Sequence, residues 1–158
     1  MQRIGMGYDS HRFAAGRPLV LGGVRIEHDQ GLAGHSDADA VLHALTDAVL
    51  GALGEDDIGR HFPDTDPQWK DADSSRFIRH AVELARRRGW AVANCDLTIV
   101  AEQPRLGPHK QAMKHRIAEL LGVAADRVAV KAKTNEWMGW VGRGEGLAVL
   151  AAVLLEGA

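Results

Sequence analysis

Hydrophobic and polar residues alternate along several short stretches of this chain, and this alternation predicts β-strands with one buried face. We expect such strands over residues 3–13, 90–101 and 127–133. The apolar run over residues 145–155 fits a buried helix or a strand, and its valines and flanking glycines favour a strand. Two short apolar runs flank a pair of glycines at positions 22 and 23, which predicts a hairpin because primed turns need positive φ at their centre.

Three other stretches carry apolar residues at the three- and four-residue spacing of an amphipathic helix. They cover residues 36–53, 73–88 and 109–121, and a glycine follows each of them, as is common at helix ends. Ser36 and Asp39 have the spacing of a capping box, so we expect the first helix to begin at Ser36.

Polar stretches over residues 27–34, 55–67 and 134–144 are expected to be loops. The second is long enough to cover an active site, although most such loops are solvated connections. The order of strands and helices predicts an α+β fold, with the helices on one face of a mixed sheet of four-stranded type. We expect a single domain over residues 1–158, since the chain has no repeat or linker.

Composition narrows the classes of function. The formal charge of -2 gives no electrostatic reason to expect nucleic acid as a partner. No apolar run approaches the length of a membrane span, and the first residues lack the apolar core of a signal peptide, so we expect a cytoplasmic protein without a membrane partner. Cys95 is the only cysteine, which excludes an intrachain disulfide and a zinc site of several cysteines.

A candidate zinc site comes from the first strand and the first helix. Asp9 and His11 are two residues apart on the strand and therefore point to the same side. His43 and Asp47 share a helix face that lies off the apolar stripe. This face meets either solvent or a polar cleft, and in a cleft Asp47 could support His43 through a hydrogen bond. Two histidines and one carboxylate are a common zinc set with an open fourth position. One Asp-x-His pair alone is weak evidence, because capping and surface pairs are commoner than metal sites.

Two further groups of residues indicate phosphate chemistry. His35 and Ser36 precede a helix amino end, where backbone N–H groups and the helix dipole favour an anion. Lys133 and Thr134 are phosphate-binding types, and Glu136 could hold a hard cation such as magnesium. Taken alone, the segment that contains Lys133, Thr134 and Glu136 is better explained as a turn between two strands than as a phosphate site. Together with the zinc set, however, these residues suggest metal-assisted phosphoryl transfer.

Five motifs in this chain resemble the signatures of the 2-C-methyl-D-erythritol 2,4-cyclodiphosphate synthase family, in the family's order. They are Gly7–Phe13, His35–Asp39, Leu42–Ala48, Asp57–Asp66 and Gly142–Gly146. The resemblance implies a phosphorus–oxygen lyase of the non-mevalonate isoprenoid pathway, which cyclises 4-diphosphocytidyl-2-C-methyl-D-erythritol 2-phosphate and releases CMP. It also implies a homotrimer with a central sheet-lined core, active sites between subunits, and a central channel that can hold an isoprenoid diphosphate.

Roles for individual residues follow from the same resemblance. Asp9, His11 and His43 would hold zinc, and Glu136 would hold a second divalent cation, magnesium or manganese. His35 and Thr134 would act on phosphate oxygens in the transition state. The implied substrate-binding residues are Asp9, Ser10, His11, His35, Ser36, Asp57, Ile58, Gly59, Phe62, Pro63, Asp64, Thr65, Asp66, Ala101, Glu102, Gln103, Pro104, Arg105, Leu106, Gly107, Lys133, Thr134, Asn135, Glu136, Trp140 and Arg143.

Four positions depart from the family pattern. Lys133 stands where Thr or Ser is usual, Arg105 replaces Lys, Trp140 replaces Phe, and Ala38 replaces Gly. The resemblance implies that residues 101–107 and 133–136 of the adjacent subunit form the cytidine diphosphate pocket. We expect these changes to alter that pocket rather than the reaction. Two alternatives to the cyclising lyase stay open at this point: a zinc-dependent phosphohydrolase on the same scaffold, and a non-catalytic trimer that only binds isoprenoid diphosphates.

Overall fold

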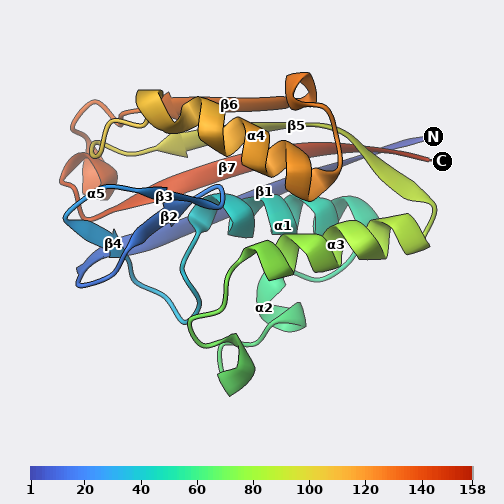
Figure 1. Ribbon diagram of the computed structural model, residues 1–158, viewed down its shortest axis with the longest axis horizontal. Helices are drawn as coiled ribbons and strands as arrows, with labels where there is room; N and C mark the ends of the chain where they lie inside the picture. Colours follow the sequence, from blue (N-terminus) through green and yellow to red (C-terminus); the bar gives the residue numbers. More distant parts are fainter. Residues whose placement is uncertain (158) are drawn as a thin grey trace.

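The computed structural model describes residues 1–157 and has an α+β fold, as the order of elements predicts. Helices cover one face of a mixed sheet with the strand order β4-β1-β7-β5-β6 (Figure 1). The strands are β1 (Gln2–Ala15), β2 (Leu19–Leu21), β3 (Val24–Ile26), β4 (Gln30–Leu32), β5 (Trp90–Val100), β6 (Val128–Lys133) and β7 (Gly146–Gly157). The α-helices are α1 (Ala40–Leu53), α2 (Ile58–His61), α3 (Ser75–Arg87), α4 (Lys110–Leu121) and α5 (Gly139–Gly142).

The central sheet has five strands, so the expectation of four was wrong. The additional strand, β4, lies within the stretch expected to be a polar loop and pairs with the end of β1, with Leu32 opposite Phe13. A three-residue strand is too short to show alternation. Its one apolar residue, Leu32, is nonetheless only 1% exposed.

Strand β7 lies at the centre of the sheet and pairs antiparallel with β1 and β5. The strand interpretation of the apolar run over residues 145–155 is therefore confirmed. The run lacks alternation because small or apolar residues occupy both faces: Val149 and Val153 are buried on the helix side, whereas Leu150 on the other side is 43% exposed. The hairpin is also confirmed, since β2 and β3 meet at glycines with φ of 62° and 72°.

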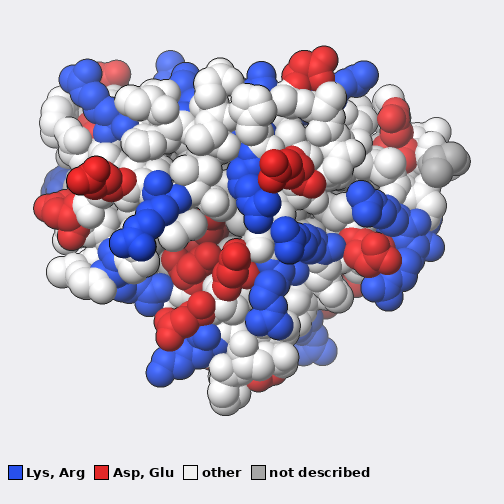
Figure 2. Space-filling view, in the orientation of Figure 1, with Lys and Arg blue, Asp and Glu red and all other residues white. Residues whose placement is uncertain are grey.

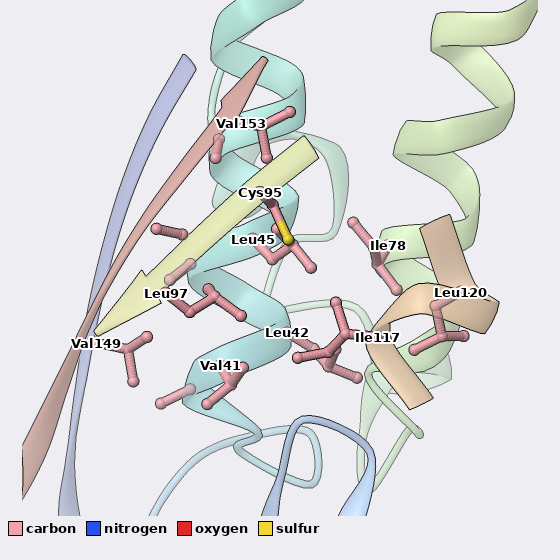
Figure 3. Packing of buried hydrophobic residues seen from close by; sticks show 14 of the residues in the cluster. Val41, Leu42, Leu45, Ile78, Cys95, Leu97, Ile117, Leu120, Val149 and Val153 are labelled. Atoms are coloured by element: carbon pink, nitrogen blue, oxygen red, sulfur yellow. The ribbon is translucent and has the colours of Figure 1, made fainter. Parts of the chain in front are cut away.

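The core fills the space between the sheet and the helices (Figure 3). Helix α1 is buried on both sides, because it lies between β1 and α3. Side chains that meet there include Val41, Leu42, Leu45, Ile78, Cys95, Leu97, Ile117, Leu120, Val149 and Val153. The cysteine is free and buried, as expected.

Two glycines let α1 approach the backbone of β1. A Cβ atom at Gly7 would lie 1.8 Å from the carbonyl oxygen of Ala44, and one at Gly5 would lie 1.8 Å from that of Ala48. Any side chain at these positions would push the helix away from the strand. The close approach matters for function because His43, next to Ala44 in α1, faces the strand that carries Asp9 and His11.

The start of α1 differs from the expected capping box. The helix begins at Ala40, and Asp39 is its N-cap, accepting a hydrogen bond from the Leu42 N–H. The same carboxylate accepts hydrogen bonds from the N–H groups of Gly22 and Gly23, so it also fixes the hairpin against the helix. Ser36 therefore does not cap the helix. Ala38, where the family favours glycine, has a φ of 58°, a conformation that costs a non-glycine residue roughly 1 kcal/mol.

The face of the sheet opposite the helices is open within residues 1–157. On β1, this face carries Ile4 and Met6, each 72% exposed, and Tyr8, which is 56% exposed. A row of exposed apolar side chains on a sheet is typical of a surface that another protein surface covers. On the opposite side of the molecule, acidic and basic side chains are intermingled (Figure 2). None of the helices in the described chain has both the length and the apolarity to cross a bilayer.

We predict that Gly7→Ala destabilises the protein by about 3 kcal/mol or more, because the new methyl group overlaps the backbone of α1. Gly51→Ala is the matched control within α1. A Cβ there would meet no atom closer than 3.8 Å, so the better helix propensity of alanine should stabilise the protein by about 0.5–1 kcal/mol. Urea unfolding measures both changes. Equal effects of the two substitutions would contradict the close packing of β1 and α1.

Candidate active site

Asp9, His11 and His43 meet where β1 and α1 touch. The Asp9 Oδ2 atom lies 2.8 Å from His11 Nε2 and 3.2 Å from His43 Nδ1, and the two nitrogens are 3.3 Å apart. The three side chains are all half-buried. They form the one group of three or more His, Cys, Asp or Glu residues within residues 1–157 whose atoms are close enough to hold a metal ion.

The spacing of these atoms fits a tetrahedral metal. Ligands about 2.1 Å from a zinc ion lie about 3.4 Å from one another. Two of the three separations in the structure are close to that value, and the third, between Asp9 Oδ2 and His11 Nε2, is shorter. The other nitrogen of His11, Nδ1, lies 2.7 Å from the carbonyl oxygen of Ala33 and donates to it, which leaves the Nε2 lone pair free. The donor set therefore fits zinc.

The local electrostatics follow from the same contacts. Burial alone would raise the pKa of Asp9. When the nitrogens of His11 and His43 that face it are protonated, hydrogen bonds and charge interactions outweigh burial and lower the pKa to about 2. Burial alone would lower the pKa of His11, and the contact with Asp9 outweighs it, so this pKa is raised. A carboxylate that stays ionised beside two histidines is suited to a divalent cation.

A pocket of about 400 Å³ opens beside this group. It brings together many of the residues that the resemblance assigned to substrate. Its lining consists of His11, Gly34, His35, Ser36, His43, Ile58, Gly59, Phe62, Pro63, Asp64, Trp69 and Phe77. Three residues expected at the pocket are not in its lining: Thr65, and the two aspartates Asp57 and Asp66, which cap short helical turns. His35 is held near the wall, because its Nε2 atom lies 3.1 Å from the Asp66 carbonyl oxygen.

One wall of the pocket is aromatic. The ring of Phe62 lies 4.5 Å from that of Phe77 and 5.1 Å from that of Trp69. Trp69 and Phe77 are not among the substrate-binding residues that the resemblance implies. By its spacing Phe77 belongs to the core face of its helix, and nothing in the sequence distinguishes a core aromatic residue from one in a pocket wall.

Asp47, which the sequence suggested as a support for His43, instead binds a backbone N–H group of the pocket wall. Its Oδ1 atom accepts a hydrogen bond of 2.7 Å from the Ile58 N–H, which ties the segment over residues 55–67 to α1. Part of that segment is the short helix α2, and the segment forms one side of the pocket. Asp47 therefore holds the pocket wall. No hydrogen bond joins it to His43 within residues 1–157.

A second pocket, of about 520 Å³, lies at the ends of β5 and β6. It is lined by Ala101, Glu102, Pro104, Arg105, Leu106, Gly107, Pro108, Lys110, Ala132, Lys133 and Thr134. The two segments assigned to a cytidine diphosphate pocket are thus brought together, although Gln103, Asn135 and Glu136 do not line it. Its lining shares no residue with the first pocket, and β7 separates β1 from β5 in the sheet.

The loop after β6 is fixed by a buried acid. Glu102 is 8% exposed, and its Oε1 atom accepts hydrogen bonds from the N–H groups of Asn135 and Trp137. Glu136 lies between them with a φ of 51° and belongs to no group of metal-binding side chains in the described chain. The expected loop over residues 134–144 also contains the short helix α5.

The remaining residues assigned to substrate lie near the amino-terminal strand. Ser10 and Trp140 line a small cavity of about 280 Å³ with His11, Arg12 and Glu145. Arg143 forms an ion pair with Glu145, in which the nitrogen and oxygen are 2.8 Å apart.

Comparison with known proteins connects this geometry to a family. The model of the YgbB family matches residues 2–156. The chain is 57% identical to the 2-C-methyl-D-erythritol 2,4-cyclodiphosphate synthase of Xanthomonas axonopodis pv. citri over 153 residues, which are 97% of this chain and 92% of that protein. It is 56% identical to the bifunctional enzyme IspD/IspF of Caulobacter vibrioides, matching 98% of this chain but only 40% of the length of that relative. A solved 2C-methyl-D-erythritol-2,4-cyclodiphosphate synthase in a CDP-bound form has a TM-score of 0.90 and 42% identity, covering 98% of this chain and all of that one.

The low pKa of Asp9 predicts how the metal-free protein responds to acid. Because the folded pKa is about 2 and the ordinary value is 3.8, the ionised Asp9 stabilises the fold above pH 3.8, and this stabilisation is lost as the pH falls toward 2. The loss should be about 2 kcal/mol. In Asp9→Asn, this part of the pH dependence should disappear, as measured by urea unfolding over a series of pH values. Asp126→Asn, at an exposed position, is the control, and an unchanged acid slope in Asp9→Asn would refute the assignment.

Proposed function

The chain belongs to the YgbB family, and on this premise we propose that it catalyses the cyclisation of 4-diphosphocytidyl-2-C-methyl-D-erythritol 2-phosphate to 2-C-methyl-D-erythritol 2,4-cyclodiphosphate, with release of CMP. The observation that carries the proposal is the group Asp9, His11 and His43 beside an aromatic-walled pocket, whose lining includes both histidines. The high identity to a synthase, over nearly the whole length of both chains, supports it.

The reaction requires little covalent chemistry from the protein. An oxygen of the substrate's own 2-phosphate attacks the β-phosphorus, and the bond from that phosphorus to the bridging oxygen breaks as CMP leaves. The attacking phosphate is already an anion, so no general base is needed. The protein has to fold the substrate back on itself, keep the attack in line and neutralise charge.

Residues of the first pocket suit the methylerythritol end of the substrate. Asp9, His11 and His43 would hold zinc, which would supply a Lewis acid and a template for phosphoryl oxygens. Phe62, Trp69 and Phe77 would cover the carbon skeleton and exclude water. His35 would then contact a phosphate oxygen in the transition state.

Residues of the second pocket suit the cytidine diphosphate end. Arg105, Lys110 and Lys133 surround a concave surface that could receive a diphosphate, and the CDP-bound relative shares this fold. Lys133 and Arg105 are two of the four departures from the family pattern, and both place a cation beside the pocket. Thr134 would act on a phosphate oxygen, and Glu136 would ligate a second divalent cation, magnesium or manganese.

Because the two pockets share no residue within one chain, we propose that a complete active site forms between subunits of a homotrimer. The open sheet face supports this assembly, since it carries apolar side chains that a neighbouring chain would bury. Arg143 would face a central channel able to hold an isoprenoid diphosphate. A cytoplasmic location remains a prediction from the sequence.

The test of the reaction is product identification by ³¹P NMR after incubation of purified protein with the cytidylyl substrate, zinc and magnesium. The proposal predicts a cyclic diphosphate and an equal amount of CMP, without incorporation of ¹⁸O from labelled water. Inorganic phosphate or a linear product carrying ¹⁸O would identify a phosphohydrolase instead. Absence of turnover with zinc-loaded protein would favour a binding protein.

The proposed assembly predicts that Met6→Asp affects the trimer and turnover but not zinc binding. A carboxylate in the middle of the open sheet face should dissociate the trimer and abolish turnover, while zinc binding stays unchanged because Asp9 and His11 lie on the opposite face of β1. Analytical ultracentrifugation and metal analysis measure the two properties. Ala112→Asp, at an exposed position on α4, is the control and should remain a trimer. A monomeric Met6→Asp protein with full activity would contradict an active site between subunits.

A further inference from the structure

His43 is held from the side of its ring that faces away from Asp9. Its Nε2 atom lies 2.8 Å from the Ser74 hydroxyl and 3.2 Å from the Ser36 hydroxyl. Ser74 precedes α3 and is fully buried, although its hydroxyl does not cap that helix. The buried hydroxyl therefore lies against the imidazole for a reason other than helix capping.

The direction of the hydrogen bond between His43 and Ser74 follows from Asp37. The Oδ1 atom of Asp37 is in close contact with the Ser74 hydroxyl, and its Oδ2 atom accepts a hydrogen bond from the Ser74 N–H. Oδ1 also accepts from the Asp39 N–H. Because an ionised carboxylate can only accept, the Ser74 hydroxyl donates its proton to Asp37. Its oxygen is then left to accept a hydrogen bond from His43.

We propose that Asp37 and Ser74 are positioning residues that hold His43 in the tautomer with hydrogen on Nε2, so that the lone pair of Nδ1 points at the metal position. The inference rests on the metal-binding part of the proposed function. Outer hydrogen bonds of this kind fix the tautomer and the orientation of metal-binding histidines. Here a carboxylate reaches the histidine through a serine hydroxyl instead of directly.

The contacts of His11 support the same arrangement. The carbonyl oxygen of Ala33 accepts from its Nδ1, so its Nε2 lone pair also points at the metal position. Two unprotonated ring nitrogens 3.3 Å apart, next to the carboxylate of Asp9, repel one another in the absence of a cation. The protein thus fixes both rings from outside in an arrangement that a bound cation stabilises.

Ser36 has a different place in this network. Its oxygen accepts a hydrogen bond from the Ala38 N–H, and its contact with His43 Nε2 is longer than that of Ser74. When His43 carries its hydrogen on Nε2, that nitrogen cannot accept a hydrogen bond from the Ser36 hydroxyl. The hydroxyl is therefore free to donate into the pocket that Ser36 lines.

The experiment compares Ser74→Ala with Ser75→Ala, a substitution of the adjacent serine, whose hydroxyl does not contact His43. Zinc affinity is measured by competition with a chromophoric chelator. Ser74→Ala should bind zinc about 10- to 100-fold more weakly than wild type, and Ser75→Ala should match wild type. Ser74→Thr keeps the hydroxyl and should recover most of the affinity.

The tautomer is a readout that a purely structural role would not change. In the metal-free protein Asp9 competes with Ser74 for the His43 proton, because Asp9 Oδ2 lies 3.2 Å from His43 Nδ1. Long-range ¹H–¹⁵N correlation spectra of the metal-free protein in alkaline buffer should show His43 mainly protonated on Nε2 in wild type and Ser75→Ala. Ser74→Ala should shift the population toward Nδ1–H. Asp37→Asn should shift the population toward Nδ1–H, because the new amide can donate to Ser74 and reverse the hydrogen bond.

Wild-type protein with His43 protonated on Nδ1 would overturn the inference, and this measurement stands even if a variant fails to fold. Zinc affinity in Ser74→Ala equal to that of wild type would also overturn it. Either result leaves the proposed reaction intact when wild type binds zinc and turns over. Wild type that binds no zinc would instead contradict the proposed function, while the tautomer of the metal-free protein would still decide the inference.

Discussion

The contact between the backbones of β1 and α1 is the constraint on which the candidate site depends. Gly5 and Gly7 remove the side chains that would separate the helix from the strand. As a result, His43 reaches the side of β1 that carries Asp9 and His11. A metal site assembled from two elements requires a fixed distance between them, and close packing of backbone on backbone resists change in that distance more than packing between flexible side chains.

The surrounding structure supports this contact from several directions. Asp39 ties the start of α1 to the hairpin, and Asp47 ties its middle to the pocket wall. Burial of almost the whole helix between the sheet and α3 leaves His43 and Asp47 as the half-buried polar residues of α1. The helix thus serves as the common support for the metal ligands and for the segment that closes the pocket.

Much of this arrangement could be predicted from local patterns. Alternation placed Asp9 and His11 on one side of a strand, and the position of His43 off the apolar stripe predicted that it faces either solvent or a polar cleft. Features that depend on distant contacts could not be predicted in this way. Residue Leu32 belongs to a strand too short to alternate, Trp69 and Phe77 look like ordinary apolar residues, and Ser74 resembles a simple helix cap. The capping box at Ser36 was wrong because Asp39, three residues later, makes better use of its carboxylate with three backbone donors.

The two pockets of one chain are separate, but a substrate with a nucleotide at one end and a phosphorylated polyol at the other needs both pockets. The open sheet face is significant because it is a surface through which neighbouring chains could bring the two pockets together. The metal group nevertheless comes first, because the proposed reaction depends on it. Its most direct test is the zinc content of purified wild type and His11→Ala, by atomic emission after dialysis, with circular dichroism as the check on folding. An equimolar amount of zinc in wild type and almost none in a folded His11→Ala protein is the predicted result. A wild-type chain without zinc, or a variant that retains it, would contradict the account.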